Sequence, residues 1–281
     1  MTHQLAVLVH TPVHSAVAGT LTYVSELPLT VGSLVRVPLG QRELLGVVWD
    51  APLDTTPATF DPQKLRPIAS VLDGIAPLSA SWRQLVTFAA NYYQRSVGEV
   101  ALAALPPQLR DLSTQQWGRR LKRHAKASVV AESALADASE LVALSLEQTG
   151  AIAQFNTNSG PFLLFGATGS GKTEVYLQCV EQLLAREPDA QAMVMVPEIN
   201  LTPQLEARFM ARFGPIYGDS AVVSMHSGMT PAQRLKSWLA AHSGGARIVL
   251  GTRMAIFASL PKLKLIIVDE EHDPSYKSGE G

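Results

Sequence analysis

Hydrophobic residues in the first third of the chain form short runs that alternate with turn residues. The runs are rich in valine and leucine, which is typical of the strands of a small β-barrel or sandwich. The predicted strands are 5–10, 21–25, 34–38, 44–49 and 68–72. Apolar residues at helical spacing then predict a helix over 79–95 and a shorter one over 98–105. Pro106 and Pro107 follow, and we expect them to end this part of the chain.

From residue 144 onward, short apolar runs alternate with amphipathic segments. This alternation is the pattern of an α/β fold with a parallel sheet. The predicted strands are 162–165, 192–196, 221–224, 247–251 and 263–268. The main predicted helices are 173–186, 202–213 and 231–242. Thr230 is the expected N-cap of the last helix, because Pro231 suits a first helical turn.

The stretch 108–143 separates these two patterns, and we interpret it as a linker. It contains a basic run over 119–126. Such a run is either the solvated face of a helix or a segment that contacts DNA phosphates. The sequence therefore predicts a mostly-β domain over 1–107 and an α/β domain over 144–281.

Residues 166–173 read Gly-Ala-Thr-Gly-Ser-Gly-Lys-Thr and fill every fixed position of a phosphate-binding P-loop. In such a loop, backbone N–H groups surround an anionic phosphate, Lys172 reaches the β- and γ-phosphates, and the Thr173 hydroxyl binds Mg²⁺. An ordinary glycine turn is the alternative, but the predicted strand, loop and helix in succession favour the P-loop. The expected nucleotide contacts are Gly166, Thr168, Gly169, Ser170, Gly171, Lys172 and Thr173.

A pair of carboxylates follows the last predicted strand. Asp269 is expected to hold Mg²⁺, and Glu270 is expected to orient and activate the water that attacks the γ-phosphate. Many strands end in a carboxylate at a turn, so the pair alone is weak evidence. Its position after a P-loop favours catalysis of ATP hydrolysis, with Lys172, Asp269 and Glu270 as the catalytic residues.

Composition limits the other functions. The 23 Lys and Arg residues nearly balance the 24 Asp and Glu residues, so any nucleic-acid role depends on local patches. The single cysteine, Cys179, leaves no disulfide pair and no multi-cysteine zinc site within these 281 residues. No apolar run is long enough to span a membrane, and residues 1–4 lack the features of a signal peptide. We therefore expect a cytoplasmic protein with no membrane partner.

The letters Asp-Glu-Glu-His at 269–272 resemble the DExH box of superfamily 2 helicases. Other segments are similar to the motifs of the PriA family, primosomal proteins that restart stalled replication forks. These segments are 166–176, 196–204, 226–228, 251–253 and 267–277, with looser similarity at 35–40 and 98–106. The resemblance covers nearly all of the chain outside the linker. It implies a 3′-DNA-end-binding domain over 1–107 and a first RecA-like helicase lobe over 144–281.

The resemblance also implies an ATP-dependent DNA helicase of 3′–5′ type in primosome assembly and replication restart, with ATP and Mg²⁺ as cofactors. Gln148 matches a glutamine that reads adenine. The implied DNA contacts are Leu21, Thr22, Gly40 and Arg66 at a nascent 3′ end, His226, Ser227, Gly228, Thr252 and Arg253 on the backbone, and Tyr276 at the start of an aromatic-rich loop. Family members carry an aromatic residue and an acid where this chain has Leu21 and Thr22, so we expect weaker stacking there. The implied partners are forked DNA, other primosome proteins, single-stranded DNA-binding protein and the replicative helicase loader.

The sequence departs from the family pattern in two places. The linker is too short for the family's winged-helix domain, and neither a second RecA-like lobe nor paired CxxC zinc sites follow the DEEH motif within these 281 residues. That lobe supplies arginines that stabilise the transferring phosphoryl group. We therefore expect half of the ATP site and half of the motor here. One alternative is a module that binds ATP and forked DNA with little or no helicase activity. The other is an unrelated P-loop enzyme such as a small-molecule kinase, against which the DEEH motif argues.

Overall fold

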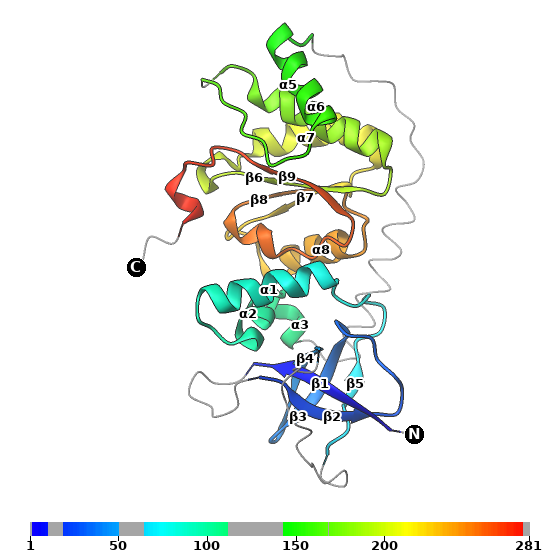
Figure 1. Ribbon diagram of the computed structural model, residues 1–281. Coiled ribbons are helices and arrows are strands. Elements are labelled where there is room, and N and C mark those ends of the chain that lie inside the picture. Colours follow the sequence, from blue (N-terminus) through cyan, green and yellow to red (C-terminus); the bar gives the residue numbers. More distant parts are fainter. Residues whose placement is uncertain (1, 11–18, 51–64, 112–142, 168, 278–281) are drawn as a thin grey trace. The chain divides into compact units, whose positions relative to one another are not determined.

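The computed structural model describes residues 2–10, 19–50, 65–111, 143–167 and 169–277 (Figure 1). The chain divides into two compact units. The first unit comprises Met1–Ala127, Gly228–Ser243 and Phe257–Pro261, and the second comprises Ser128–Ser227, Gly244–Ile256 and Lys262–Gly281.

A five-stranded antiparallel sheet forms the centre of the first unit, in the order β2-β1-β4-β3-β5. The strands are β1 (His3–Val9), β2 (Leu21–Ser25), β3 (Leu34–Leu39), β4 (Arg42–Val48) and β5 (Ser70–Val71). Val24 on β2 donates to Arg66 O at 3.1 Å and accepts from Ile68 N at 3.0 Å. These two bonds join one edge strand to the residues before the other, so the sheet curls and closes on itself. A closed sheet has fewer free edges, as the strand pattern of a small barrel predicted.

Three helices follow the sheet in the first unit, namely α1 (Ala80–Tyr92), α2 (Val97–Ala104) and α3 (Pro107–Asp111). Ser79 caps α1 by accepting from Trp82 N at 3.2 Å. The expectation that Pro106 and Pro107 end this region was wrong, because Pro107 opens α3 instead. Proline is tolerated in a first helical turn, where its missing N–H is not needed.

Helix α3 is held by a buried arginine of the sheet. The Arg36 guanidinium on β3 donates to Arg110 O at 2.7 Å and to Leu109 O at 2.5 Å. Arg36 is only 5% exposed, and Leu109 is fully buried. Carbonyl groups at the end of a helix lack intrahelical donors, so a buried guanidinium that satisfies them fixes α3 to the sheet.

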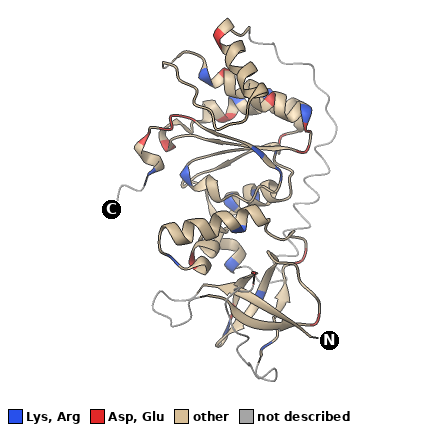
Figure 2. Cartoon of the chain, in the orientation of Figure 1, with Lys and Arg blue, Asp and Glu red and all other residues tan. Residues whose placement is uncertain are grey.

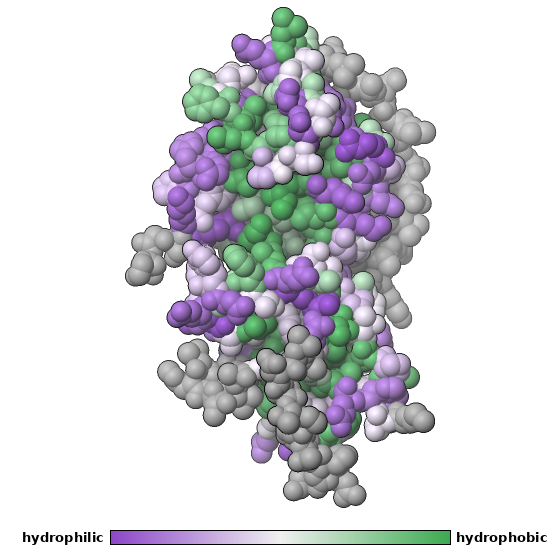
Figure 3. Space-filling view, viewed as in Figure 1, coloured by the Kyte–Doolittle hydropathy of each residue, from purple (hydrophilic) through white to green (hydrophobic). Residues whose placement is uncertain are grey.

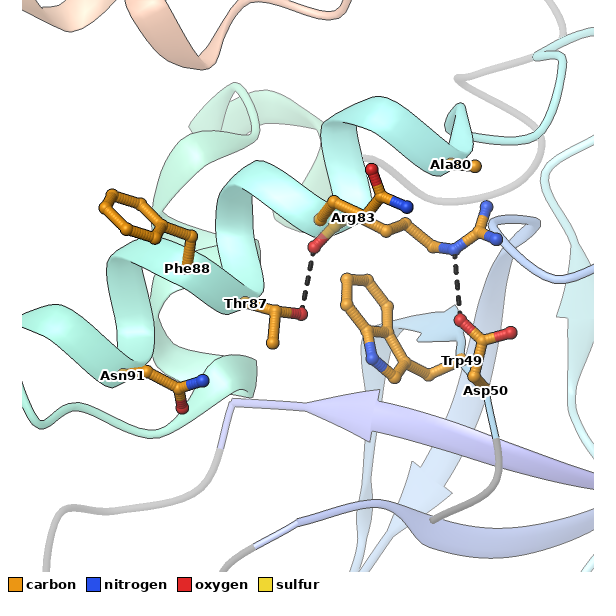
Figure 4. A pocket seen from close by; sticks show the side chains of 8 residues that line it. Trp49, Asp50, Ala80, Arg83, Thr87, Phe88 and Asn91 are labelled. Atoms are coloured by element: carbon orange, nitrogen blue, oxygen red, sulfur yellow. Dashed lines mark hydrogen bonds and ion pairs between the residues drawn. The ribbon is translucent and has the colours of Figure 1, made fainter. Parts of the chain in front are cut away.

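A groove of about 390 Å³ lies between α1 and the end of β4 (Figure 4). Arg83 crosses it, and the Arg83 Nε lies 3.4 Å from Asp50 Oδ2. The remaining lining residues are Trp49, Ala80, Gln84, Thr87, Phe88 and Asn91. None of the four residues expected at a DNA 3′ end belongs to this lining.

Helix α8 (Pro231–His242) also belongs to the first unit. Thr230 caps it and forms a capping box with Gln233, as the sequence predicted for the N-cap. The last residue of α8, His242, is buried. Its Nδ1 lies 2.9 Å from Ser259 Oγ, its Nε2 lies 2.8 Å from Ala76 O, and its ring stacks on Trp238. Both ring nitrogens therefore have partners, which fixes the end of α8 against residues before α1 and after residue 256.

The second unit has a four-stranded parallel sheet in the order β7-β8-β6-β9. The strands are β6 (Gln191–Met195), β7 (Val222–Met225), β8 (Ile248–Gly251) and β9 (Leu263–Val268). Helices α6 (Lys172–Arg186) and α7 (Pro203–Tyr217) cover one face of this sheet, and α5 (Leu146–Thr157) lies against α6 (Figure 1). Phe209 and Phe213 of α7 are fully buried against the sheet. The predicted fold class, a RecA-like P-loop lobe with a parallel sheet and a small mostly-β domain before it, is confirmed.

The predicted strand over 162–165 is wrong. These residues are extended without strand pairing, and Leu163 and Phe165 are 83% and 94% exposed. Figure 3 shows hydrophobic side chains on this face of the unit. An apolar run forms a strand only beside a hydrogen-bonding neighbour. Among the described strands, β9 ends the sheet and pairs with β6 alone, and 162–165 does not pair with its outer edge.

Candidate functional site

The P-loop turns directly into α6. Gly169 and Gly171 have φ angles of 80° and 83°, in the left-handed region that favours glycine, and Gly171 is the N-cap of α6. A Cβ on Gly171 would stand 2.3 Å from Gln148 Nε2, and one on Gly166 would stand 2.7 Å from Ser170 Oγ. The left-handed φ angle at Gly171 favours glycine, and a Cβ at Gly166 or Gly171 would displace the end of a neighbouring side chain. The N-terminus of the 15-residue α6 favours an anion at this place. Thr168 lies outside the described residues.

Lys172 places its ammonium group over the loop. Lys172 Nζ donates to Gly166 O at 2.7 Å and to Ala167 O at 3.1 Å. The side chain thus arches back across the loop that it follows. An ammonium held at the mouth of a glycine loop is the arrangement that phosphate binding requires.

Asp269 and Glu270 lie at the carboxyl edge of the parallel sheet. Asp269 N donates to Met195 O at 2.8 Å, directly after β9 and β6 end. Burial raises the pKa of the Asp269 carboxyl, and the neighbouring Glu270 raises it further. The Tyr276 hydroxyl donates to Asp269 O at 2.8 Å, so the following turn is tied back to the motif. Figure 2 shows red, acidic positions in this segment after β9.

Glu270 has an unusual backbone conformation. Its φ angle is 48°, a left-handed value that a non-glycine residue seldom adopts. Two hydrogen bonds hold the turn: Glu270 N donates to Asp269 Oδ1 at 3.1 Å, and Asp273 N donates to Glu270 O at 2.8 Å. The exposed His272 Nε2 lies 3.6 Å from Glu270 Oε2. Strained backbone conformations that the surroundings maintain concentrate at functional sites.

The P-loop and the DEEH motif meet at Tyr176 of α6. The Tyr176 hydroxyl lies 3.4 Å from Asp269 Oδ2, and Thr173 lies one turn before Tyr176 on the same face of α6. The structure thus brings together Thr173 and Asp269, the two predicted Mg²⁺ ligands. Burial raises the pKa of Tyr176 to about 12. Sequence reasoning assigned Tyr176 only to an apolar helix face, although its position one turn after Thr173 was the available signal.

A buried carboxylate also escaped the sequence reasoning. Glu174 follows Thr173 directly and is only 5% exposed. It accepts from Arg212 Nη1 at 2.5 Å and from Arg208 Nη2 at 2.9 Å, and Arg212 Nη2 also donates to Glu181 at 2.6 Å. This ion-pair cluster joins the first turn of α6 to α7. A charged residue inside an otherwise apolar helix pattern was the signal for it.

Gln148, the predicted adenine-reading residue, contacts the P-loop in this structure. Its Oε1 accepts from Ser145 N at 2.8 Å and completes the capping box that begins α5. Its Nε2 donates to Gly171 O at 3.3 Å. Helix α5 was not predicted from the sequence, although the spacing of Ser145 and Gln148 is a capping-box signal.

The predicted DNA contacts of the second unit follow the strand ends. The Ser227 hydroxyl, after β7, donates to the Glu198 carboxylate. Thr252, after β8, is buried and donates from its backbone to Met225 O at 3.1 Å, while the exposed Arg253 donates to Lys277 O at 3.0 Å. His226 is half-buried and Tyr276 lies on the turn after β9, whereas Gly228 belongs to the first unit.

The predicted 3′-end contacts lie on the sheet of the first unit. Arg66 Nη1 donates to the carbonyl oxygen of Gly40 at 3.5 Å, and both residues are exposed. Leu21 and Thr22 are half-buried on β2, the strand whose Val24 N donates to Arg66 O. The structure therefore places Arg66 at Gly40 and connects Arg66 to the strand of Leu21 and Thr22.

The residues present suit MgATP. The P-loop leaves no free space for a side chain at Gly166 or Gly171, and the Lys172 ammonium lies on the loop. The Thr173 hydroxyl and the Asp269 carboxylate lie on either side of Tyr176. These groups suit a phosphate and a hard divalent cation. Within the described ranges, no group of three or more His, Cys, Asp or Glu side chains forms a metal cluster. The helices in those ranges are all too short or too polar to cross a bilayer.

Both halves of the chain match known protein families. Residues 6–106 match the family described as the 3′ DNA-binding domain (3′BD) of PriA, and residues 145–280 match the DEAD/DEAH box helicase family. The replication restart protein PriA of Haemophilus influenzae is 31% identical over 90% of this chain and 42% of its own length. The chain belongs to the PriA family. The PriA of Rickettsia conorii is 32% identical over 91% of this chain and 36% of its own length.

The similarity to PriA is highest in one part of the chain. The PriA of Bacillus subtilis is 50% identical over 119 residues, which are 42% of this chain and 14% of the relative. The chain spans less than half the length of these curated PriA relatives. The chain thus carries a match to a DNA-binding family, followed by a match to a helicase family.

Proposed function

We propose that this chain binds MgATP between the P-loop and the DEEH motif and serves as part of an ATP-dependent, 3′–5′ DNA helicase in replication restart. One observation carries the proposal. Tyr176, one turn after Thr173 of the P-loop, places its hydroxyl 3.4 Å from Oδ2 of Asp269 in the DEEH motif. Two motifs that lie far apart in the sequence therefore form one site.

Each residue has a role in this proposal. Loop N–H groups and Lys172 bind the phosphates, and Thr173 and Asp269 hold Mg²⁺, which neutralises the charge that develops on the phosphates. The Glu270 carboxylate orients the attacking water. Its left-handed backbone lies in the turn that directly follows β9, which ends at Val268.

The DNA part of the proposal concerns forked DNA with a nascent 3′ end. Arg66 at Gly40, beside β2, is a cation next to an exposed backbone turn. A guanidinium suits a terminal phosphate or sugar oxygen of DNA. The residues after β7 and β8, among them Ser227, Thr252 and Arg253, offer further phosphate donors.

A module that binds ATP and forked DNA with little turnover is the second candidate. In the described part of the chain, Arg208 and Arg212 of α7 are bound to Glu174. These two arginines are therefore occupied in a structural cluster and do not replace arginines from another lobe at the γ-phosphate. Loss of such arginines costs about 10³- to 10⁵-fold in turnover.

ATP hydrolysis by this chain separates the candidates. Single-turnover and steady-state hydrolysis would be measured with and without forked DNA, together with unwinding, and Glu270→Gln serves as the control for chemistry. Steady hydrolysis that DNA stimulates and Glu270→Gln abolishes identifies a motor. Nucleotide and fork binding without steady hydrolysis identifies the module. Absence of ATP binding would refute both candidates.

A further inference from the structure

We propose that Tyr176 is a positioning residue for the magnesium ligands, with its hydroxyl accepting a hydrogen bond from Thr173 and donating one to Asp269. This inference rests on the proposed binding of MgATP at the P-loop. It assigns a role to a side chain outside both motifs. In this proposal Tyr176 acts on the magnesium ligands Thr173 and Asp269, whereas the loop N–H groups and Lys172 contact the phosphates.

The position of Tyr176 on α6 makes the contact possible. Residues three apart on a helix lie on the same face, so the side chains of Thr173 and Tyr176 are neighbours. The Tyr176 hydroxyl reaches from α6 to the end of β9, where it lies 3.4 Å from Asp269 Oδ2. The Thr173 side chain lies one turn earlier on the same face of α6 and is the neighbouring hydroxyl. The Tyr176 hydroxyl therefore lies between Thr173 at the start of α6 and Asp269 at the end of β9.

The ring of Tyr176 is fixed by packing. Tyr176 is 6% exposed, and its ring stacks on Phe209 of α7 with the centroids 6.3 Å apart and the planes 20° apart. Phe209 itself is fully buried. A buried ring that packs on Phe209 holds its hydroxyl at Asp269 more firmly than a flexible surface side chain would.

The chemistry of the three groups sets the direction of the hydrogen bonds. An ionised carboxylate only accepts hydrogen bonds, so the Tyr176 hydroxyl is the donor to Asp269. The Tyr176 oxygen is then the acceptor for the Thr173 proton. With its proton engaged, the Thr173 hydroxyl keeps its lone pairs for a metal ion. The protein thus orients one Mg²⁺ ligand and anchors the other through a single side chain, as groups behind metal ligands often do.

Tyr176→Phe tests this role because it removes the hydroxyl and keeps the ring on Phe209. Binding of a fluorescent ATP analogue would be measured with Mg²⁺ and with EDTA, and the Mg²⁺ concentration for half-maximal binding would be titrated. We expect affinity in Mg²⁺ to fall about three- to tenfold and the Mg²⁺ midpoint to rise, because one charge-assisted hydrogen bond is lost. Binding in EDTA should equal that of the unaltered chain.

Two controls keep the test decisive. Tyr217→Phe removes a hydroxyl from α7, which packs in the same core, and should leave the Mg²⁺ dependence unchanged. Lys172→Ala tests the proposed function separately, since it should weaken binding both in Mg²⁺ and in EDTA. If Lys172→Ala weakens binding but Tyr176→Phe keeps the original Mg²⁺ midpoint, or weakens binding equally in Mg²⁺ and EDTA, the positioning role is overturned while the nucleotide site stands. If Lys172→Ala binds normally, the nucleotide site itself is wrong.

Discussion

The Gln148 side-chain amide donates a hydrogen bond from Nε2 to the carbonyl oxygen of Gly171, across 3.3 Å. The same side chain accepts from Ser145 N through its Oε1. Gln148 therefore connects the beginning of α5 to the last glycine of the P-loop. A residue that the sequence associates with adenine also supports the loop that binds the phosphates.

Gln148→Ala should weaken ATP binding about three- to tenfold, because the P-loop loses one hydrogen bond and α5 loses half of its capping box. Titrations with ATP and with GTP would measure the effect. A loss confined to ATP supports adenine reading, and an equal loss supports only the contact with Gly171. Gln154→Ala, at the other end of α5, is the matched control. Unchanged affinity for both nucleotides in Gln148→Ala would contradict this account of the site.

Gly171→Ala should damage the P-loop more than its size suggests. The left-handed φ angle costs a non-glycine residue about 1–2 kcal/mol, and the new Cβ would also meet Gln148 Nε2 at 2.3 Å. We expect a lower melting temperature and loss of nucleotide binding. Gly150→Ala is the control, since nothing lies within 4 Å of its Cβ position and it lies inside α5. That control should stabilise by about 0.5–1 kcal/mol. Equal stability of the two variants would show that Gly171 is not constrained.

Glu174→Gln should destabilise the chain by about 2–4 kcal/mol, because it removes the buried carboxylate that pairs with the half-buried Arg212. Urea unfolding followed by circular dichroism measures this difference. Glu187→Gln, which breaks exposed pairs to Arg186 and Lys264, should change stability little. A Glu174→Gln variant as stable as Glu187→Gln would mean that the cluster between α6 and α7 contributes nothing.

His242 makes the stability of the chain depend on pH. Burial lowers the pKa of His242 below its ordinary 6.5, while the unfolded chain keeps the ordinary value. As the pH falls below about 6.5, the unfolded state therefore binds a proton that the folded state resists. Stability should be fully present above that pH and decrease below it. Melting temperatures measured between about pH 7.5 and 5.5 should fall less steeply in His242→Gln than in the unaltered chain. Parallel curves for the two proteins would contradict this assignment.

Most elements of the fold could be predicted from the pattern of apolar residues. The alternating strands of the first unit and the parallel strands 192–196, 221–224, 247–251 and 263–268 match the observed ones within a residue or two, because each has a neighbour to pair with. The run 162–165 is also apolar and forms no strand. Whether an apolar segment finds a pairing neighbour depends on tertiary structure, which local pattern does not contain.

The candidate site divides in the same way. The P-loop and the DEEH motif could be located because they carry fixed letters at fixed spacing. Tyr176 and Glu174 could not be assigned, since their roles come from contacts with Asp269 and with the arginines of α7. A tyrosine and a glutamate on a helix are usually packing or surface residues. Only the fold shows that these two face buried polar partners.

Binding of ATP in the presence of Mg²⁺, measured by titration calorimetry on this chain and on Lys172→Ala, tests the central claim most directly. The account predicts one site per chain and an affinity at least about tenfold weaker in the variant, a loss of about 1.4 kcal/mol or more, because Lys172 is the cation on the phosphate loop. Thermal melting of both proteins controls for folding. Equal affinities in two equally folded proteins would contradict the claim that the P-loop and the DEEH motif form a nucleotide site.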